Sequence, residues 1–211
     1  ENNQHVTIHL LSFTELDNNQ YIASTQVTFR AGAAERRPDL VLYVNGLPLA
    51  ILEAKTPVRN AVSWVDGAKQ LHDDYEKFIP ELFPCNALNV ATEGKDLRYG
   101  AIHTPLEHWS PWIVDSLKAR LTASKQNQAS ADEEPLRTPP KPDIKQLAES
   151  IPTLLRPHLL LDILANFTLF ATDKKKRRLK IICRYQQYEG ANKIVQRVLE
   201  GVTKKGLIWH F

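Results

Sequence analysis

The sequence predicts an α/β protein in which a mixed central sheet is flanked by helices. Short runs rich in β-branched and aromatic residues recur through the first half of the chain. Between them, residues 61–83 carry apolar side chains at every third or fourth position, which is the period of an amphipathic helix. The predicted strands cover residues 5–11, 21–30, 40–44, 49–52, 87–92 and 97–102, and the predicted helices cover 61–83, 109–121, 143–172 and 191–199.

A change of composition divides the chain in two. Residues 121–142 contain few large apolar side chains and many Ser, Gln, Asp, Glu and Pro, so they bury too little surface to offset the entropy of ordering. We expect a flexible linker there, between a first domain at 1–120 and a helical segment at 143–211 that ends in a buried strand at 207–211. Because the chain starts at Glu1 and contains no methionine, the sequence also predicts a piece of a longer protein.

The bulk composition is that of an ordinary globular chain. The 211 residues are 43% hydrophobic and 24% charged, and no apolar run is long enough to span a bilayer. Cys85 and Cys183 are too few and too far apart for a disulfide framework or a zinc site. The start carries no secretory leader, so these features predict a cytoplasmic protein with no membrane partner. The net charge of +3 neither requires nor excludes DNA.

The Asn45-Gly46 dipeptide predicts a β-hairpin with charged side chains at its open end. Asn-Gly between two apolar runs favours a tight turn that joins two strands. Residues two apart on a strand share a face. Glu53 and Lys55 are therefore expected to project together, beside Asp39 at the start of the first strand.

The register of that hairpin decides whether the carboxylates can meet. A plain two-residue turn would place Leu52 opposite Asp39 and leave Glu53 on the other face. A shared metal ion needs Asp39 across from Glu53. We therefore expect a three-residue or bulged loop around residues 45–47, which Gly46 permits by adopting a positive φ.

Two carboxylates and an amine at one end of a hairpin suit metal-assisted phosphodiester hydrolysis. Asp39, Glu53 and the carbonyl of Ala54 provide the oxygen ligands that Mg²⁺ prefers. Such an ion polarises a phosphate and lowers the pKa of a bound water. Lys55 would position that water or neutralise charge that builds on the phosphate. The alternative interpretation is a solvated surface charge pair, since Glu-x-Lys is common on exposed strands.

The spacing of these residues resembles the PD-(D/E)XK nuclease motif, with Pro38-Asp39 followed after thirteen residues by Glu53-Ala54-Lys55. Together with RRPDLVLYVNGLPLAILEAKTP, QLHDDYEKFIPELF and GLIWHF, it makes most of the chain similar to the restriction (R) subunit of type I restriction-modification enzymes. The resemblance implies a restriction-endonuclease-like fold, Mg²⁺-dependent endonucleolytic cleavage of double-stranded DNA, and assembly with methylation and specificity subunits. The competing hypothesis is a catalytically inactive nuclease-like module that binds DNA or docks partner subunits.

The same resemblance implies an ATP-driven motor beyond this chain. In the family, strands like residues 207–211 lead into the phosphate loop of a P-loop motor domain. We expect that domain to be mostly absent here, and we expect no ATP hydrolysis by this chain. Gln187 would be an adenine contact of the motor, or an ordinary glutamine at the start of a helix. Related nucleases often take a further acidic residue from a helix ahead of the first strand; the strand predicted at 5–11 leaves no room for one, so we expect weak Mg²⁺ binding.

Further residues are candidate DNA contacts. Arg37, next to Arg36, either contacts a phosphate or is solvated in its loop. In related nucleases a glutamine and a tyrosine one helical turn apart lie near DNA. Here four residues separate Gln70 from Tyr75, which puts them about 140° apart on an α-helix. We therefore expect Gln70 to support the site or contact DNA, and Tyr75, also a candidate contact, to lie chiefly in the core. The basic run 174–180 is either a solvated turn or a second phosphate contact.

Overall fold

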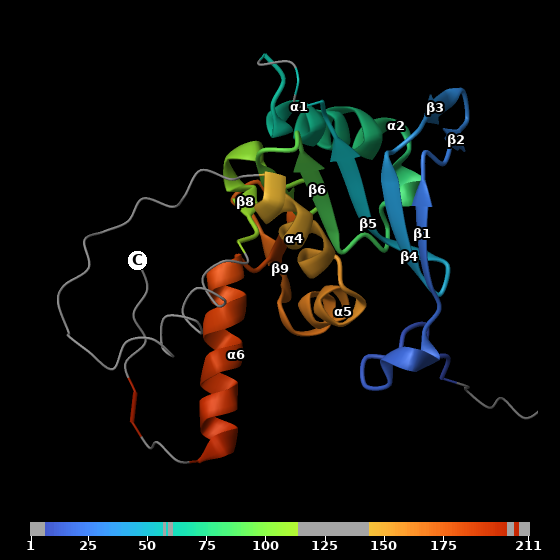
Figure 1. The fold of residues 1–211 in the computed structure, drawn as a ribbon. Helices are drawn as coiled ribbons and strands as arrows, with labels where there is room; N and C mark the ends of the chain where they lie inside the picture. Colours follow the sequence, from blue (N-terminus) through green and yellow to red (C-terminus); the bar gives the residue numbers. More distant parts are fainter. Residues whose placement is uncertain (1–6, 57, 59–60, 114–143, 202–204, 207–211) are drawn as a thin grey trace, which may run out of the picture.

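The structure, a computed structural model, describes residues 7–56, 58, 61–113, 144–201 and 205–206. In that part of the chain a six-stranded sheet carries helices on both faces (Figure 1). The predicted fold class is therefore confirmed as a mixed sheet flanked by helices. The predicted linker at 121–142 and the predicted strand at 207–211 lie outside the described residues.

The central sheet is mixed because one pair of its strands is parallel. Its members are β1 (Tyr21–Thr25), β4 (Leu40–Val44), β5 (Leu47–Ala54), β6 (Leu88–Thr92), β7 (Leu97–Gly100) and β8 (Ser110–Pro111). They lie in the order β1-β4-β5-β6-β7-β8. β5 and β6 run parallel, and the other neighbouring pairs are antiparallel. A parallel pair needs a long crossover connection, and a helix supplies it here.

The crossover from β5 to β6 is a helix that changes geometry halfway. Its parts are α1 (Trp64–Lys69), the π-helical segment η2 (Gln70–Tyr75), α2 (Glu76–Phe78) and the 3₁₀ turn η3 (Pro80–Leu82). Ser63 caps α1, because its hydroxyl oxygen accepts a hydrogen bond from the Val65 N–H at 3.2 Å. The helix predicted at 61–83 is confirmed in place, although its apolar spacing did not predict the π-helical turn.

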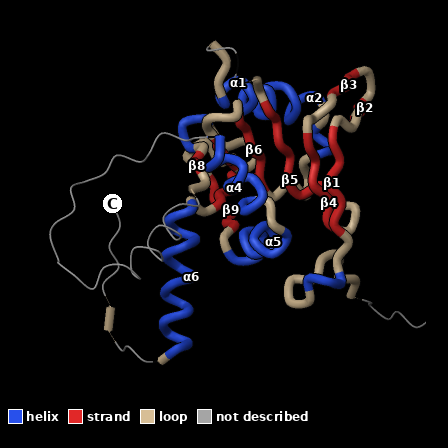
Figure 2. The backbone as a smooth tube through the Cα atoms, viewed as in Figure 1, coloured by secondary structure: helices blue, strands red, loops and turns tan. Residues whose placement is uncertain are grey.

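Hydrophobic side chains fill both faces of the sheet. Val41 packs under α1, η2 and α2, whereas its neighbour Leu40 packs against the opposite layer, as the alternation of a strand requires. That opposite layer is formed by α4 (Ile144–Leu154) and α5 (Pro157–Asn166) (Figures 1 and 2). β6 is buried along its whole length, as expected for a strand with helices on both faces.

The strand predicted at 5–11 is wrong for the residues that the structure describes there. Residues 7–11 are not in a strand, and the carbonyl of Leu10 accepts a hydrogen bond from the Asn45 side chain at 2.9 Å. The 3₁₀ turn η1 (Leu16–Asn18) follows, ahead of β1. A side-chain contact at the turn of the β4–β5 hairpin thus holds this segment in place of strand pairing.

The strand predicted at 21–30 is broken into two. Gln26 has a φ of 56°, a left-handed conformation that turns the chain out of the sheet after β1. The second half becomes β2 (Phe29–Ala31), which pairs with β3 (Ala34–Arg36) in a separate hairpin beside the helix α2 (Figure 1).

The C-terminal segment contains a hairpin where a helix was predicted. Its elements after α5 are β9 (Thr168–Thr172), β10 (Arg178–Ile182) and α6 (Tyr185–Glu200). Asp173 forms the turn between β9 and β10, because its carboxylate accepts hydrogen bonds from the N–H groups of Lys175 and Arg177, both at 2.8 Å. The helix predicted up to residue 172 is therefore wrong after Asn166, and the basic run occupies this turn and part of β10.

Two other predicted helices differ in their bounds. The helix predicted at 191–199 is part of the longer α6, which begins at Tyr185, has no buried residue among those described and projects away from the sheet (Figure 1). Of the helix predicted at 109–121, residues 109–113 are described, and they contain β8 instead. Within the described ranges, no helix is both long enough and apolar enough to cross a membrane.

Candidate active site

The β4–β5 hairpin closes with a tight turn and carries a bulge in its second strand. Asn45 and Gly46 have φ angles of 51° and 80°, so both residues of the turn are left-handed, as in a two-residue type I′ connection. Further along, the pairing with β4 skips Leu49, so β5 contains one extra residue there. The bulge expected in the loop at 45–47 thus lies in the strand.

The bulge brings the two candidate carboxylates to one face of the sheet. Beyond it Leu40 pairs with Leu52, so the residues just outside this pair, Asp39 and Glu53, stand across from each other. The face that they share is the one covered by α1 and η2. The expectation that an irregular register aligns Asp39 with Glu53 is confirmed, and only the position of the irregularity is corrected.

Asp39 lies half-buried ahead of β4, and both of its carboxylate oxygens accept hydrogen bonds. Oδ2 accepts from the backbone N–H of Ala54 at 2.8 Å, which ties Asp39 to the end of β5. Oδ1 accepts from the side-chain amide of Gln26 at 2.5 Å. The sequence motif contains no place for Gln26, and no pattern around it predicts the contact.

Glu53 is buried, and two side chains contact its carboxylate. The residue is 4% exposed. Its Oε1 lies 2.8 Å from Lys55 Nζ, and its Oε2 accepts a hydrogen bond from the Tyr75 hydroxyl at 3.2 Å. Burial raises the pKa of the Glu53 carboxyl, the Lys55 ammonium opposes the rise, and the Asp39 carboxylate adds to it. A cation bound beside Glu53 would favour its ionised form.

Lys55 links the strands β5 and β6, the Glu53 carboxylate and the π-helical segment η2 through hydrogen bonds. Its ammonium donates to Glu53 and also to Oε1 of Gln70. Its backbone N–H donates to the carbonyl of Thr92 at 2.7 Å, which extends the pairing of β5 with β6 one residue past Ala54, the last residue of β5. The side chain is 23% exposed, so the amine is held in place and still reached by solvent.

The π-helical segment places Gln70 and Tyr75 on the same side of the helix. The N–H of Glu76 donates to the carbonyl of Leu71, five residues back, which is the hydrogen-bond step of a π-helix. Residues five apart therefore align, and Gln70 Nε2 donates to the Tyr75 hydroxyl at 2.6 Å. The predicted separation of about 140° is wrong, because it assumed an α-helix throughout.

Four side chains close a ring of hydrogen bonds: Glu53, Lys55, Gln70 and Tyr75. Tyr75 is 2% exposed, so its predicted place in the core is confirmed. Its hydroxyl also lies 3.4 Å from the carbonyl oxygen of Arg37. Burial, and after it the charge of Glu53, raises the pKa of Tyr75, so the hydroxyl keeps its proton. Contact of Gln70 or Tyr75 with DNA stays a prediction.

A glycine lets helix α1 approach the site strand closely. A Cβ at Gly67 would lie 3.2 Å from the carbonyl oxygen of Glu53 and 3.4 Å from the Cβ of Ala91. Any larger residue would press the helix away from β5 and β6. The missing side chain therefore helps to bring Gln70, at the start of η2, within reach of Lys55.

The two arginines ahead of the motif have different surroundings. Arg36 donates to both carboxylate oxygens of Asp74, each at 2.7 Å, and its guanidinium lies 4.9 Å from the centre of the Phe78 ring. This bidentate pair joins β3 to η2, so the Arg36 side chain makes a structural contact. Arg37 is exposed, which leaves it accessible to a phosphate. Its contact with DNA stays a prediction.

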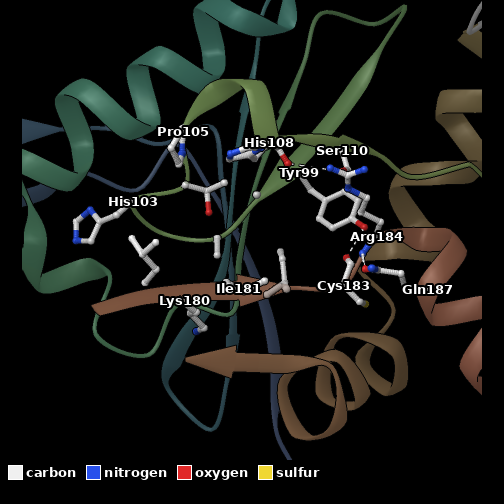
Figure 3. Close-up of a pocket in the computed structure, with 15 residues that line it drawn as sticks. Tyr99, His103, Pro105, His108, Ser110, Lys180, Ile181, Cys183, Arg184 and Gln187 are labelled. Atoms are coloured by element: carbon white, nitrogen blue, oxygen red, sulfur yellow. Dashed lines mark hydrogen bonds between the residues drawn. The ribbon is translucent and has the colours of Figure 1, made fainter. Parts of the chain in front are cut away.

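Gln187 lies apart from these residues, at the start of α6. Its Oε1 accepts a hydrogen bond from the Arg184 N–H at 2.8 Å, which is the helix-start role that its position in the sequence allows. It also lines a cavity of about 410 Å³ between β10 and the segment around the 3₁₀ turn η4 (Leu106–His108) (Figure 3). Lys180 and Arg184 line the same cavity. Contact of Gln187 with adenine stays a prediction.

The donor atoms at the Asp39–Glu53 end of the hairpin fit a hard divalent cation. Two carboxylates and the carbonyl of Ala54 are all oxygen donors, the kind that Mg²⁺ prefers. In the described part of the chain, no group of three or more His, Cys, Asp and Glu side chains is arranged to hold a metal. Two carboxylates would leave most positions around the ion to water, which suits Mg²⁺.

Comparison with known proteins places the chain in a family. The family model for the N terminus of type I restriction enzyme R proteins matches residues 1–108. The chain is 28% identical over 209 residues to the type I restriction enzyme HindI endonuclease subunit of Haemophilus influenzae, covering 96% of this chain and 18% of that protein. It is 28% identical over 218 residues to the type I restriction enzyme MjaVIIP endonuclease subunit of Methanocaldococcus jannaschii, with the same coverage of 96% and 18%.

The match covers the whole candidate active site. Residues 1–108 include Asp39, Glu53, Lys55, Gln70 and Tyr75, whereas Gln187 lies outside that range. The chain spans less than a fifth of the length of the two relatives, 18% in each case. The chain belongs to the family of type I restriction enzyme R proteins, and residues 1–108 match the N-terminal part of that family.

Proposed function

We propose that the Asp39–Glu53 site is a Mg²⁺-dependent endonuclease centre that cleaves double-stranded DNA within a type I restriction subunit. The observation that carries the proposal is the alignment of Asp39 with Glu53, together with Lys55 at 2.8 Å from the Glu53 carboxylate. Two carboxylates and an amine at one end of a strand pair provide what metal-assisted phosphodiester hydrolysis needs. Membership of the restriction family supports this chemistry over a solvated charge pair.

Each side chain has its own part in the proposed reaction. Asp39, Glu53 and the carbonyl of Ala54 would hold the ion, which would supply polarisation of the phosphate and activation of a water. The Lys55 ammonium has three N–H groups, and two donate to Glu53 and Gln70. The third is available to the attacking water or to a phosphate oxygen, where it offsets developing charge.

The partners of the site are proposed from the family. The relatives are named as endonuclease subunits of type I restriction enzymes. We propose that this chain likewise works on double-stranded DNA beside methylation and specificity subunits, with exposed Arg37 as a phosphate contact. ATP is proposed for a motor in the remainder of such a protein, with Gln187 as the candidate adenine contact.

A second candidate function is a nuclease-like module that only binds DNA or docks partner subunits. Both carboxylate oxygens of Glu53 are already engaged, by Lys55 and Tyr75, which favours a purely structural ring. Titration calorimetry with Mn²⁺ distinguishes the two candidates. Binding that is lost in Glu53→Ala supports the nuclease, and a wild-type chain that takes up no ion even at millimolar Mn²⁺ supports the structural module.

The proposal is tested by plasmid nicking in the full-length restriction complex. Asp39→Asn, Glu53→Gln and Lys55→Ala, made singly, should each lower Mg²⁺-dependent cutting by at least about a hundredfold, because each removes part of the charge pattern at the reacting phosphate. Lys55→Ala should leave DNA affinity nearly unchanged, since its charge acts mainly on the transition state. Lys69→Ala, an exposed lysine at the end of α1, is the matched control. Wild-type cutting rates in any of the three site variants would contradict the assignment.

A further inference from the structure

Gln26 contacts Asp39 twice and belongs to no recognised part of the site. Its backbone N–H donates to the Asp39 carbonyl at 3.1 Å, and its side-chain amide donates to Oδ1 of the same residue at 2.5 Å. It follows the last residue of β1, Thr25, which pairs with Leu40, so the β1–β4 register delivers it to the start of the motif strand.

We infer that Gln26 is a positioning residue that fixes the orientation of the Asp39 carboxylate for a divalent cation. The inference rests on the proposed function, because it concerns the ion that Asp39 would hold. Asp39 receives one donor on each oxygen, Gln26 on Oδ1 and the Ala54 N–H on Oδ2. Rotation of the carboxylate would break both hydrogen bonds. Each oxygen keeps a further lone pair that can coordinate a cation.

The kind of donor supports this role. Glu53 is held by an ammonium, which neutralises part of its charge. The two hydrogen bonds that Asp39 receives come from an amide side chain and a backbone N–H, and neither carries a net charge. Asp39 is thereby oriented and keeps its full negative charge for an ion. Hydrogen bonds of this type to metal-binding carboxylates typically change affinity or activity by about 10- to 100-fold.

The backbone of Gln26 gives an independent reason to assign a role. Its φ of 56° lies in the left-handed region, which costs a residue with a side chain about 1–2 kcal/mol relative to glycine. Such conformations persist where surrounding contacts hold them, and they gather at functional sites. Here the contacts that hold the strained residue are the two to Asp39.

The strain makes a clean test possible. Gln26→Gly removes the amide and relieves the backbone, so the variant should fold with equal or greater stability in urea. Its affinity for Mn²⁺, measured by titration calorimetry on the 211-residue chain, should nevertheless fall about tenfold or more. Gln26→Lys keeps a donor and adds a positive charge, so its affinity should fall too. The matched control is Lys176→Gly, which relieves a φ of 61° in the exposed turn between β9 and β10 and should leave Mn²⁺ affinity unchanged.

A second measurement covers binding that is too weak for calorimetry. In the full-length restriction complex, Gln26→Gly should raise the Mg²⁺ concentration for half-maximal cutting by the same factor and should recover most of the wild-type rate at saturating Mg²⁺. An unchanged Mg²⁺ requirement, or Mn²⁺ affinity within twofold of wild type, overturns the role of Gln26. Asp39→Asn distinguishes failure of the Gln26 role from failure of the proposed metal site. If Asp39→Asn still binds the ion, the proposed function fails with the inference; if it loses the ion and Gln26→Gly does not, only the inference fails.

Discussion

The proposed role of Glu53 conflicts with its burial. Its carboxylate must be ionised to hold a cation, yet burial favours the protonated form and raises its pKa. The folded state therefore binds a proton at Glu53 more tightly than the unfolded state does. The stabilisation that follows is fully present below the ordinary value of 4.5 and is lost as the pH rises through the raised pKa.

Glu53→Gln should therefore stabilise the chain at neutral pH while abolishing metal-dependent cutting. The amide keeps the shape of the side chain and removes a buried charge, so the gain should be on the order of 1 kcal/mol in the free energy of unfolding. Urea unfolding of both proteins at pH 4 and pH 8 measures the difference. The advantage of the variant should grow with pH, and an advantage that is the same at both pH values would contradict the burial argument.

Tyr75→Phe should weaken cutting out of proportion to its effect on stability. The lost hydroxyl removes hydrogen bonds to Gln70 and Glu53, which should cost about 1 kcal/mol in unfolding free energy and about tenfold in cutting rate. Tyr99→Phe is the matched control, since Tyr99 is equally buried and donates to the Cys183 carbonyl at 2.7 Å. Urea unfolding should show a similar decrease in the free energy of unfolding for both variants. Plasmid nicking should show a lower cutting rate for Tyr75→Phe alone. An equal cutting defect in Tyr99→Phe would point to general loosening of the fold.

At the scale of residues, the sequence could predict the charged residues of the site but few of the residues that hydrogen-bond to them. Asp39, Glu53 and Lys55 follow from strand alternation and one motif spacing. The partnership of Gln70 with Tyr75 does not follow, because it depends on a hydrogen-bonding pattern of the helix backbone. Gln26 gives no signal at all, since its contact with Asp39 depends on the register of two strands.

The π-helical segment η2 is the element on which the four-residue ring depends. In an α-helix, residues four apart lie on one face, whereas Gln70 and Tyr75 are five apart. The wider π-helical turn accommodates the extra residue and so places the pair on one face. Downstream of it, Glu76 is fixed by hydrogen bonds from His103 and Asn89. The helix is therefore anchored on both sides of the wide turn.

Deletion of Asp73 should convert η2 to an ordinary α-helical turn and keep the ring intact. Asp73 is exposed and pairs with His72 and Lys77 at the surface, so its loss removes little packing. With Gln70 and Tyr75 then four apart, an α-helix aligns them, and both thermal stability and cutting should stay close to wild type. Insertion of one alanine after Asp73 is the matched control; it should misalign the pair and abolish cutting. A deletion variant that folds but cannot cut would show that the π-helical turn is needed for more than alignment.

At the scale of elements, the sequence predicted which helices and strands exist better than it predicted where they begin and end. The strands of the hairpin, the crossover helix and β6 follow from apolar periodicity. The bulge at Leu49 was needed on chemical grounds but was expected in the loop at residues 45–47, because a bulge within a continuous apolar run leaves the run unchanged. The β9–β10 hairpin was not predicted because apolar residues continue from α5 into β9, and apolar runs alone do not separate helix from strand.

At the scale of the whole molecule, the two sides of residues 114–143 share one hydrophobic core. Leu154, Leu160 and Ile163 of α4 and α5 belong to the same buried cluster as Leu52 and Val90 of the sheet. The candidate site lies on the opposite face, under α1 and η2. The layer formed by α4 and α5 thus packs on the face of the sheet opposite the candidate site.

A chain that ends at residue 113 should therefore fail to fold cooperatively. Without α4 and α5, one apolar face of the sheet would be open to water, a loss far larger than a domain of this size tolerates. Urea unfolding followed by tryptophan fluorescence should show no sharp transition. A chain that ends at residue 190 is the matched control, because it keeps the contacts of Tyr185 and Tyr188, and the described residues that it removes, 191–201 and 205–206, are mainly exposed. A sharp transition in the shorter chain would show that the sheet and its crossover helix suffice.

The backbone hydrogen bond from Lys55 to Thr92 makes the proposed catalytic lysine a reporter of global opening. β5 lies between β4 and β6 in the interior of the sheet, and hydrogen-bonded amides of such core strands exchange with deuterium with free energies that approach that of global unfolding. The backbone amide of Gln26, just after the edge strand β1, should instead exchange through local fraying. One deuterium-labelling experiment would thus report the free energy of global unfolding at the Lys55 amide and the free energy of local opening beside Asp39 at the Gln26 amide. A cation held by Asp39 and Glu53 should slow exchange at both, because it binds only the closed state.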